Sequence, residues 1–210
     1  MLKTDIIILA AGKGTRMRSV LPKVLHKLAG KPLINHVVKA ANTVTNSKII
    51  VVTGHGAELV ESAVADKNTR FVKQAQQLGT AHAVACALPH LRKDSRVLIL
   101  YGDVPLIDPQ TIEGILNKVS EAQMGLLTVE LQDPTGYGRI LRDSNNNIEA
   151  IVEQKDAVSE QLSITEVNTG VMALSSRQLQ VWLPQIRNEN AQGEYYLTDL
   201  IAIARKQGIT

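Results

Sequence analysis

The sequence predicts an α/β protein in which a mixed, mostly parallel sheet is flanked by helices. Continuous apolar and β-branched runs, typical of strands buried on both faces, occupy residues 5–10, 48–53 and 96–101. Apolar residues at helical spacing fill the segments between and after them, over residues 33–44, 57–65 and 79–91. Strand and helix alternate, as in βαβ units. In such a sheet the ligand lies beyond the carboxyl ends of the strands, where we expect the functional residues to gather.

The second half of the chain departs from this alternation. We expect a helix over residues 109–122, a strand over 125–131, and a hairpin formed by 138–142 and 148–152 around the Asn-rich turn 143–147. A further strand over 164–174 precedes helices over 177–186 and 195–206. We see no internal repeat and no evident linker, so we expect a single domain over residues 1–210. Its lobes are a nucleotide-binding lobe over about residues 1–108 and a second-substrate lobe over about 109–210.

The composition excludes several classes of protein. Apolar residues make up 44% and charged residues 20% of the chain, a balance typical of a folded protein with a sizeable core. The single cysteine, Cys86, cannot form an internal disulfide, so we expect a buried structural thiol in a reducing cytoplasm. The apolar runs are too short to cross a bilayer, so we expect no membrane insertion. Aromatic residues at 3% argue against a nucleic-acid partner, despite a sequence pI near 9.0.

Positive charge is concentrated at the start of the sequence. Residues 1–31 hold seven lysines and arginines against one acid, Asp5, and so carry +6, whereas the rest of the chain carries −3. A positive excess confined to one segment that begins with an apolar strand indicates a local phosphate site, and a small polyphosphate as the partner. The alternative is a solvated face of lysines and arginines that binds no ligand.

A glycine-rich segment, Leu-Ala-Ala-Gly-Lys-Gly-Thr-Arg-Met, follows the first predicted strand over residues 9–17. Small residues let the backbone approach a ligand, and glycines permit turns that strain other residues, so this segment is a candidate phosphate cradle. The dinucleotide-binding fingerprint needs a third small residue where Met17 stands, and the Walker A loop needs a different glycine spacing. Neither motif therefore applies, and a plain tight turn remains the alternative.

Asp103 ends the third predicted strand, in the sequence Tyr101-Gly102-Asp103. A carboxylate at the carboxyl end of a parallel strand points into the ligand crevice. Mg²⁺ that bridges phosphates commonly takes only one or two protein oxygens, so Asp103 is our candidate metal ligand. The alternative is an aspartate that caps the turn before Val104.

Several motifs carry a resemblance to a known family. The segment LAAGKGTRM followed by LPKVL resembles the signature of sugar-1-phosphate nucleotidylyltransferases. The motifs QxxLGTAHA, LYGDVPL, DPTGYGRI, IVEQKDA, EVNTGV and NAQGEYYLTD are similar to those in the uridylyltransferase half of bacterial bifunctional enzymes that make UDP-N-acetylglucosamine. The resemblance covers essentially the whole chain and implies a Rossmann-like nucleotidyltransferase fold of the nucleotide-diphospho-sugar transferase type.

The resemblance also implies roles for individual residues. It assigns catalytic roles to Arg16, Lys23 and Asp103, of which the two cations would face the phosphates. Guanidinium and ammonium groups suit this place, because they neutralise charge that moves toward a leaving pyrophosphate. Lys13 ranks below them, since an exposed lysine on a turn is the alternative. The tract 192–199 is expected to shape the edge of a sugar pocket. The implied substrate contacts are Leu9, Ala10, Ala11, Gly12, Lys13, Gly14 and Lys23, then Gln74, Gly79 and Thr80 for uracil and ribose, Tyr101, Gly102 and Asp103, and Gly138, Glu153 and Asn168 for the sugar.

The implied reaction joins UTP and N-acetylglucosamine-1-phosphate to give UDP-N-acetylglucosamine and pyrophosphate, with Mg²⁺, as a step toward peptidoglycan and lipopolysaccharide precursors. In the family, a second metal ligand, an asparagine, comes from a later Gly-Val-Asn segment. Family proteins also carry a C-terminal β-helix that acetylates glucosamine-1-phosphate and drives trimerisation. Its hexapeptide repeats do not occur here. We therefore expect a C-terminally truncated, monomeric fragment of a homotrimeric parent.

Two other functions remain open. The pattern of histidines in the sequence favours neither of them. One is another nucleotidylyltransferase, which would pair UTP or dTTP with a different sugar-1-phosphate. The other is a nucleotide-sugar binding module without turnover. The five histidines show neither metal-ligand spacing nor a nucleophile–base signature, so we expect structural roles for them, and His82 is expected to pack in a helix.

Overall fold

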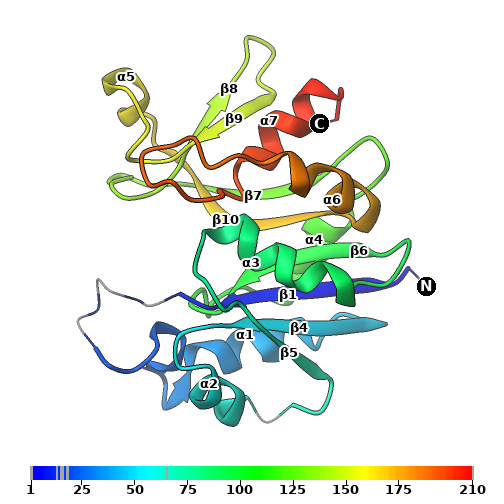
Figure 1. Cartoon of the computed structure of the whole chain (residues 1–210). Helices are drawn as coiled ribbons and strands as arrows, with labels where there is room; N and C mark the ends of the chain where they lie inside the picture. Colours follow the sequence, from blue (N-terminus) through cyan, green and yellow to red (C-terminus); the bar gives the residue numbers. More distant parts are fainter. Residues whose placement is uncertain (1, 13, 15–16, 18, 65, 210) are drawn as a thin grey trace.

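The computed structural model describes residues 2–12, 14, 17, 19–64 and 66–209, and its centre is an eight-stranded sheet (Figure 1). The strand order is β5-β4-β1-β6-β10-β8-β9, with β7 paired to β10. The strands of this sheet are β1 (Thr4–Ala10), β4 (Ser47–Thr53), β5 (Thr69–Lys73), β6 (Arg96–Tyr101), β7 (Gly125–Glu130), β8 (Arg139–Arg142), β9 (Ile148–Val152) and β10 (Glu166–Ser175). A separate ribbon pairs β2 (Lys27–Leu28) with β3 (Lys31–Pro32).

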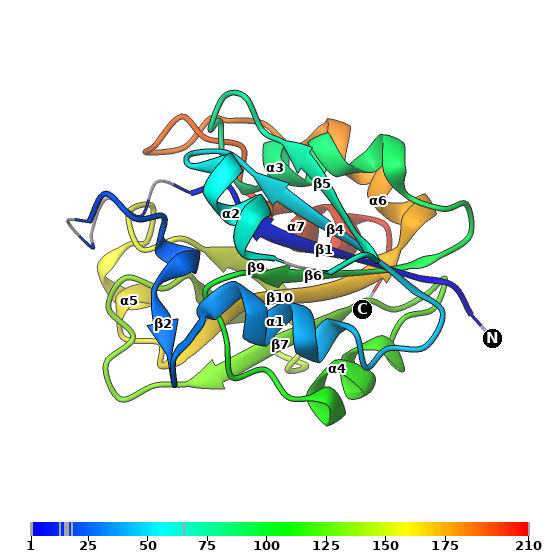
Figure 2. The same ribbon diagram turned by 90° about the horizontal axis from the view of Figure 1, so that it is seen from below.

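Helices cover both faces of the sheet. Viewed from below, α1 and α4 lie on one side and α3 and α6 on the other (Figure 2). The α-helices are α1 (Leu33–Ala41), α2 (Ala57–Ala63), α3 (Thr80–Ala87), α4 (Pro109–Leu116), α5 (Ser159–Leu162), α6 (Ser176–Trp182) and α7 (Asp199–Lys206). Short 3₁₀ turns are η2 (Lys23–Leu25), η3 (Leu88–His90) and η4 (Leu183–Gln185). Within the described residues, none of the helices combines the length and the apolar character that crossing a membrane requires.

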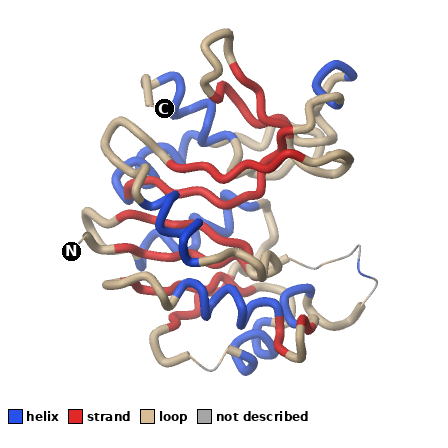
Figure 3. The backbone as a smooth tube through the Cα atoms, turned by 180° about the vertical axis from the view of Figure 1, so that it is seen from behind, coloured by secondary structure: helices blue, strands red, loops and turns tan. Residues whose placement is uncertain are grey.

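The central strands are apolar throughout because both of their faces are buried. Ile6 and Ile8 of β1 pack into the core beneath α1 and α4, whereas Ile7 and Leu9 pack into the core beneath α3, α6 and α7. β1 pairs in parallel with β4 and β6, and β4 with β5. β10 then runs antiparallel to β6, so the sheet is mixed, as predicted. Figure 3 shows the sheet from behind, with its strands in red and the helices that flank it in blue.

The three predicted central strands are confirmed, and they are neighbours in the order β4-β1-β6. The sequence did not predict β5, because charged and half-exposed residues interrupt the apolar pattern of this edge strand. It also missed the short β2, β3 and α5. The predicted hairpin is present as β8 and β9. Several predicted helices are shorter than expected, and the largest differences are that α4 ends at Leu116 and that α7 begins only at Asp199.

Cys86 departs from its expected environment. It lies on α3, but its burial is intermediate, so the prediction of a buried thiol is wrong. The buried face of this helix is formed by Ala81, Ala83, Val84 and Ala87. Partial burial still raises the pKa of the Cys86 thiol, which keeps the sulfur protonated near neutral pH.

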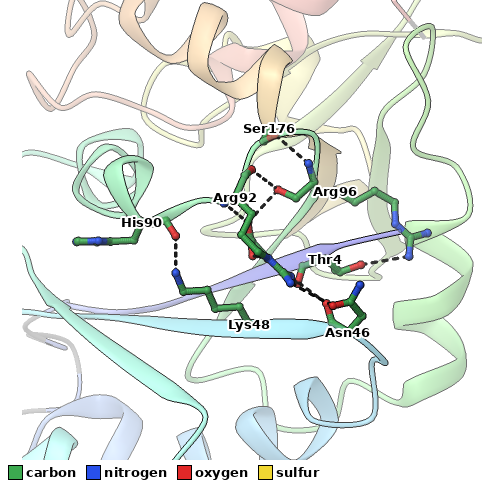
Figure 4. Close-up of polar contacts among 9 residues, drawn as sticks. Thr4, Asn46, Lys48, His90, Arg92, Arg96 and Ser176 are labelled. Carbon is green, nitrogen blue, oxygen red and sulfur yellow. Dashed lines mark hydrogen bonds and ion pairs between the residues drawn. The ribbon is translucent and has the colours of Figure 1, made fainter. Parts of the chain in front are cut away.

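A network around Asp5 ties together the amino ends of three strands (Figure 4). The Asp5 carboxylate is fully buried and accepts hydrogen bonds from Nε of Arg92 at 2.7 Å, the Arg92 backbone amide at 2.7 Å and the Ser95 hydroxyl at 2.9 Å. The Arg92 guanidinium also donates to the carbonyl oxygens of Thr4 at 2.7 Å and Asn46 at 2.9 Å. β1, β4 and β6 are thereby held together at the end of the sheet opposite their carboxyl ends.

Candidate active site

A cavity of about 580 Å³ lies at the carboxyl ends of β1, β5 and β6. This is the position at which ligands bind in parallel α/β sheets. Most residues predicted to contact the nucleotide line it: Leu9, Ala10, Ala11, Gly12, Gly14, Lys23, Gln74, Gly79, Thr80, Tyr101 and Asp103. The structure therefore gathers in one cavity residues that are more than ninety positions apart in the sequence.

The remaining residues predicted at the nucleotide and phosphates are Lys13, Arg16 and Gly102. Lys13 and Arg16 lie outside the described residues. Gly102 is buried behind the cavity lining, where its amide donates to the Leu9 carbonyl at 2.9 Å. A Cβ at Gly102 would lie 3.0 Å from Cγ1 of Val24, so the small residue lets β6 pack closely at this point.

The loop after β1 lines the cavity with Ala11, Gly12, Gly14 and Met17. The Ala11 carbonyl accepts a hydrogen bond from the His55 amide at 3.4 Å, which links this loop to the end of β4. Gly14 has a φ of +60°, and a Cβ there would lie 2.9 Å from Cβ of Lys23. Both observations require glycine at position 14 and bring the loop against η2, the turn that carries Lys23.

Lys23 and Asp103 form an ion pair inside the cavity. Nζ of Lys23 contacts Oδ2 of Asp103, and the side chains are 47% and 20% exposed respectively. Asp103 lies two residues beyond the end of β6. Within the part of the chain that the structure describes, its carboxylate accepts no backbone hydrogen bond, so the alternative of a turn-capping aspartate is not favoured. A cation and a carboxylate thus face the same space, as phosphate and metal binding require.

The opposite end of the cavity is formed where α3 begins. Gly79 precedes this helix with a φ of +115°, and a Cβ there would lie 2.5 Å from the Tyr195 carbonyl oxygen. The Thr80 hydroxyl accepts a hydrogen bond from the Leu197 amide at 2.9 Å. The Ala81 amide donates to the Tyr195 carbonyl, also at 2.9 Å. The segment before α7 is therefore fixed against the start of α3.

Replacing Gly79 with alanine should lower the free energy of unfolding by about 1–3 kcal/mol, because alanine is strained at this φ and its Cβ meets backbone. The matched control is Gly114→Ala on the exposed face of α4, where a Cβ has open space. That variant should be about 0.5–1 kcal/mol more stable than wild type. Urea unfolding of both variants measures the difference, and equal stabilities would contradict the packing described for Gly79.

The predicted sugar residues form a second cluster. The backbone amide of Asn168 donates to the Gly138 carbonyl at 2.9 Å, and a Cβ at Gly138 would lie 3.4 Å from Cδ of Glu153. The structure thus brings together the residue that precedes β8, the residue that follows β9 and a residue of β10. They are not among the residues that line the 580 Å³ cavity. Tyr101 connects the two places, since it lines the cavity and its ring packs against Gly170 of β10.

Burial dominates the electrostatics of this region. Desolvation raises the pKa of the Tyr101 hydroxyl, and the charges of Glu153 and Asp103 raise it further. Burial likewise raises the pKa of Glu153, although the Thr198 hydroxyl donates to its carboxylate at 3.2 Å. The neighbouring charges of Asp156 and Asp199 act in the same direction as burial. The raised pKa keeps the Tyr101 hydroxyl neutral near pH 7.

Glu153→Gln should stabilise the fold in a pH-dependent manner. The pKa of Glu153 is raised in the folded state above its ordinary value of 4.5, so its ionisation opposes folding as pH rises. The glutamine variant should match wild type below about pH 4.5 and become progressively more stable than wild type above it. Thermal unfolding between pH 4 and pH 8 measures this difference. A difference that shrinks as pH rises would contradict it.

Some residues that line the cavity were not predicted from the sequence. Gln77 and Glu194 line the cavity beside the predicted residues, as do Met17, Val24 and Ala83. Glu194 belongs to the tract that we expected at the edge of the sugar pocket, and it is among the residues that line the 580 Å³ cavity. No local signal marks Gln77, which lies in a loop and donates to the Gln74 carbonyl at 3.0 Å.

Solved structures with the same architecture are nucleotidyltransferases. A UDP-glucose pyrophosphorylase complexed with UDP-glucose superposes on this chain with a TM-score of 0.74 at 19% sequence identity. The superposition covers 98% of this chain and 88% of the pyrophosphorylase. A nucleotidyl transferase from Methanothermobacter thermautotroptrophicus gives a TM-score of 0.68 at 21% identity over 99% of this chain and 84% of that one. These likenesses confirm the predicted nucleotidyltransferase fold.

Curated relatives are far more similar in sequence. The Bifunctional protein GlmU of Cellvibrio japonicus is 58% identical over 205 residues, which are 98% of this chain and 45% of that protein. The protein of the same name from Alcanivorax borkumensis is 53% identical over 97% of this chain and 45% of its own length. The chain thus spans about half the length of the curated relatives it matches. The profile of the MobA-like NTP transferase domain matches residues 6–163. The chain is therefore a member of the MobA-like NTP transferase domain family and a nucleotidyltransferase.

Proposed function

We propose that this nucleotidyltransferase transfers UMP from UTP to N-acetylglucosamine-1-phosphate and releases pyrophosphate. The observation that supports this most is that one cavity is lined by Gly12 and Gly14 of the glycine-rich loop, by the Lys23–Asp103 ion pair and by the buried Gln74 with Gly79. One end of this cavity suits a polyphosphate and the other suits a base. The sugar phosphate would lie toward Gly138, Glu153 and Asn168, whose carboxylate and amide groups suit hydroxyl and N-acetyl groups.

The chain's own residues would act mainly by charge and position. The attacking oxygen belongs to a phosphate that is already largely ionised near pH 7, so the protein needs no general base. The sugar phosphate oxygen forms a bond to the α-phosphorus of UTP as the bond to pyrophosphate breaks. Lys23 neutralises charge on the phosphates, which otherwise repel one another. Arg16 is proposed for the same role on the basis of the sequence resemblance.

Asp103 is proposed to hold Mg²⁺. Its carboxylate faces an open cavity at the end of β6, and phosphate-bound Mg²⁺ needs only one or two protein oxygens, so the residue fits this ion. Mg²⁺ bound there would offset phosphate charge. Among the described residues, no group of three or more His, Cys, Asp or Glu side chains forms a metal site, so a cage made by the protein alone is not found in that part of the chain.

The setting of the reaction is proposed from the same resemblance. A cytoplasmic compartment suits a chain with one cysteine, and the product would feed peptidoglycan and lipopolysaccharide precursors. The relatives that the chain matches are about twice as long and are named bifunctional. A homotrimeric parent protein that also acetylates glucosamine-1-phosphate is proposed from the family resemblance alone.

Pyrophosphate release tests the proposal. The assay pairs UTP, CTP or dTTP with N-acetylglucosamine-1-phosphate or glucose-1-phosphate, and calorimetry measures UTP binding in parallel. We expect the fastest release with UTP and N-acetylglucosamine-1-phosphate. Fastest release with another pair would identify a different nucleotidylyltransferase, whereas UTP binding without release would indicate a binding module.

A further inference from the structure

The orientation of the Gln74 side-chain amide is fixed by its neighbours. Its Nε2 lies 3.2 Å from the carbonyl oxygen of Gly79. A carbonyl oxygen only accepts hydrogen bonds, so the group that faces it is the NH₂ of Gln74 and not the oxygen. The same Nε2 lies 2.9 Å from Nδ1 of His82. Because the amide nitrogen can only donate, Nδ1 of His82 accepts, and the proton of the neutral imidazole is on its Nε2.

Gly79 and His82, both at the start of α3, therefore fix the side-chain amide of Gln74 by hydrogen bonds. His82 is the third residue of α3, and Gly79 immediately precedes that helix. Gln74 follows the end of β5, so the two hydrogen bonds connect the strand to the helix across the cavity wall. Both hydrogens of the NH₂ group are used by these two acceptors.

Of the other polar atoms of Gln74, the side-chain oxygen Oε1 is left for a ligand. Its backbone amide donates to the Thr53 carbonyl at 2.7 Å, and its carbonyl accepts from Nε2 of Gln77 at 3.0 Å. Among the residues that the structure describes, no hydrogen bond reaches Oε1. Gln74 is only 3% exposed and yet lines the cavity. A ligand at this end of the cavity thus meets an oriented acceptor on a largely buried side chain.

We propose that His82 is a positioning residue that sets the base specificity of this site by presenting Oε1 of Gln74 as an acceptor. The proposal rests on the proposed function and deepens it. Uracil carries a hydrogen at N3 that this acceptor can bind, whereas N3 of cytosine is itself an acceptor. Cytosine would leave two buried acceptors face to face and unpaired, which a buried site rejects. Thymine also carries the N3 hydrogen, so this device does not separate UTP from dTTP.

Without His82 the amide keeps only the longer bond to Gly79. Its terminal torsion has a broad, roughly two-fold preference, so the NH₂ group can then turn toward the base and donate to N3 of cytosine. The preference for UTP over CTP is expected to fall by about tenfold, the size of one buried hydrogen bond. The effect appears in the ratio of the two affinities and not in the affinity for UTP alone.

Calorimetry with UTP and CTP on three variants tests this inference. His82→Phe keeps an aromatic ring but removes the acceptor, and we expect the ratio of the CTP to the UTP dissociation constant to fall about tenfold. His82→Asn places an amide oxygen near the position of Nδ1 and should keep most of the preference. His90→Phe, at the far end of the same helical segment, is the matched control and should leave the ratio at its wild-type value.

The outcomes separate the inference from the proposed function. If wild type does not prefer UTP to CTP, the proposed function fails and the inference fails with it. If wild type prefers UTP and folded His82→Phe keeps that ratio, or loses both affinities in parallel, only the inference is overturned. Nitrogen-15 shifts of His82 in wild type provide a readout that needs no variant. They should show Nδ1 unprotonated at neutral pH, and a protonated Nδ1 would overturn the inference.

Discussion

Replacing Asp103 with asparagine should lower turnover of UTP by about 10²–10³-fold while the protein remains folded. The variant keeps the size of the side chain but removes its charge, so it replaces the proposed carboxylate metal ligand with a neutral, weaker one and removes the ion-pair partner of Lys23. Steady-state pyrophosphate release measures the effect, and circular dichroism checks the fold.

The matched control is Asp108→Asn, which lies beyond the same strand at the start of α4. Asp108 caps that helix through the Thr111 amide at 2.9 Å, and asparagine caps equally well, so stability and turnover should both stay near wild type. Lys23→Ala should lose turnover by a similar factor to Asp103→Asn. Near-normal rates in either cavity variant would remove that residue from the proposed mechanism.

Asp5→Asn should lower the free energy of unfolding by about 3 kcal/mol. Asp5 is fully buried and its two oxygens accept three hydrogen bonds, two of them from Arg92, of which one comes from the charged guanidinium. Asparagine would leave the guanidinium without its counter-charge and would bring an NH₂ group against donors. Urea unfolding measures the loss.

Asp94→Asn is the matched control for this buried pair. Asp94 also pairs with an arginine, Arg177, at 2.7 Å, but the two side chains are 63% and 73% exposed. Its φ of +54° is a conformation that asparagine tolerates, so the substitution adds no backbone strain. Exposed pairs contribute little, so no measurable change is expected. Equal losses in Asp5→Asn and Asp94→Asn would contradict the importance of burial for the Asp5 network.

The centre of the fold could be predicted because burial imposes a simple pattern there. β1, β4 and β6 are covered on both faces, so their sequences are apolar without interruption. β5 lies at the edge of the sheet and mixes charged with apolar residues, so its pattern is weak. Helix ends were less predictable, because the start of α7 depends on hydrogen bonds that residues 195–197 make to the distant start of α3.

The candidate site was predictable where it depends on strand ends. The glycine-rich loop and Asp103 follow predicted strands, and the carboxyl ends of parallel strands meet at one edge of a sheet. Gln74 was predicted only through the family resemblance, because β5 itself was missed. Gln77 and Glu194 lie in loops whose course is set by tertiary contacts, such as the 2.9 Å hydrogen bond from the Tyr195 amide to the Leu78 carbonyl. The same holds for His82, whose bond to Gln74 no local pattern indicates.

A crystal structure with UTP bound tests most directly whether this cavity is the nucleotide site. We predict uracil N3 within hydrogen-bonding distance of Oε1 of Gln74, and the triphosphate beside Gly12, Gly14 and Lys23. Density for UTP at any other place on the molecule, with this cavity empty, would contradict the assignment of the site and the mechanism proposed for it.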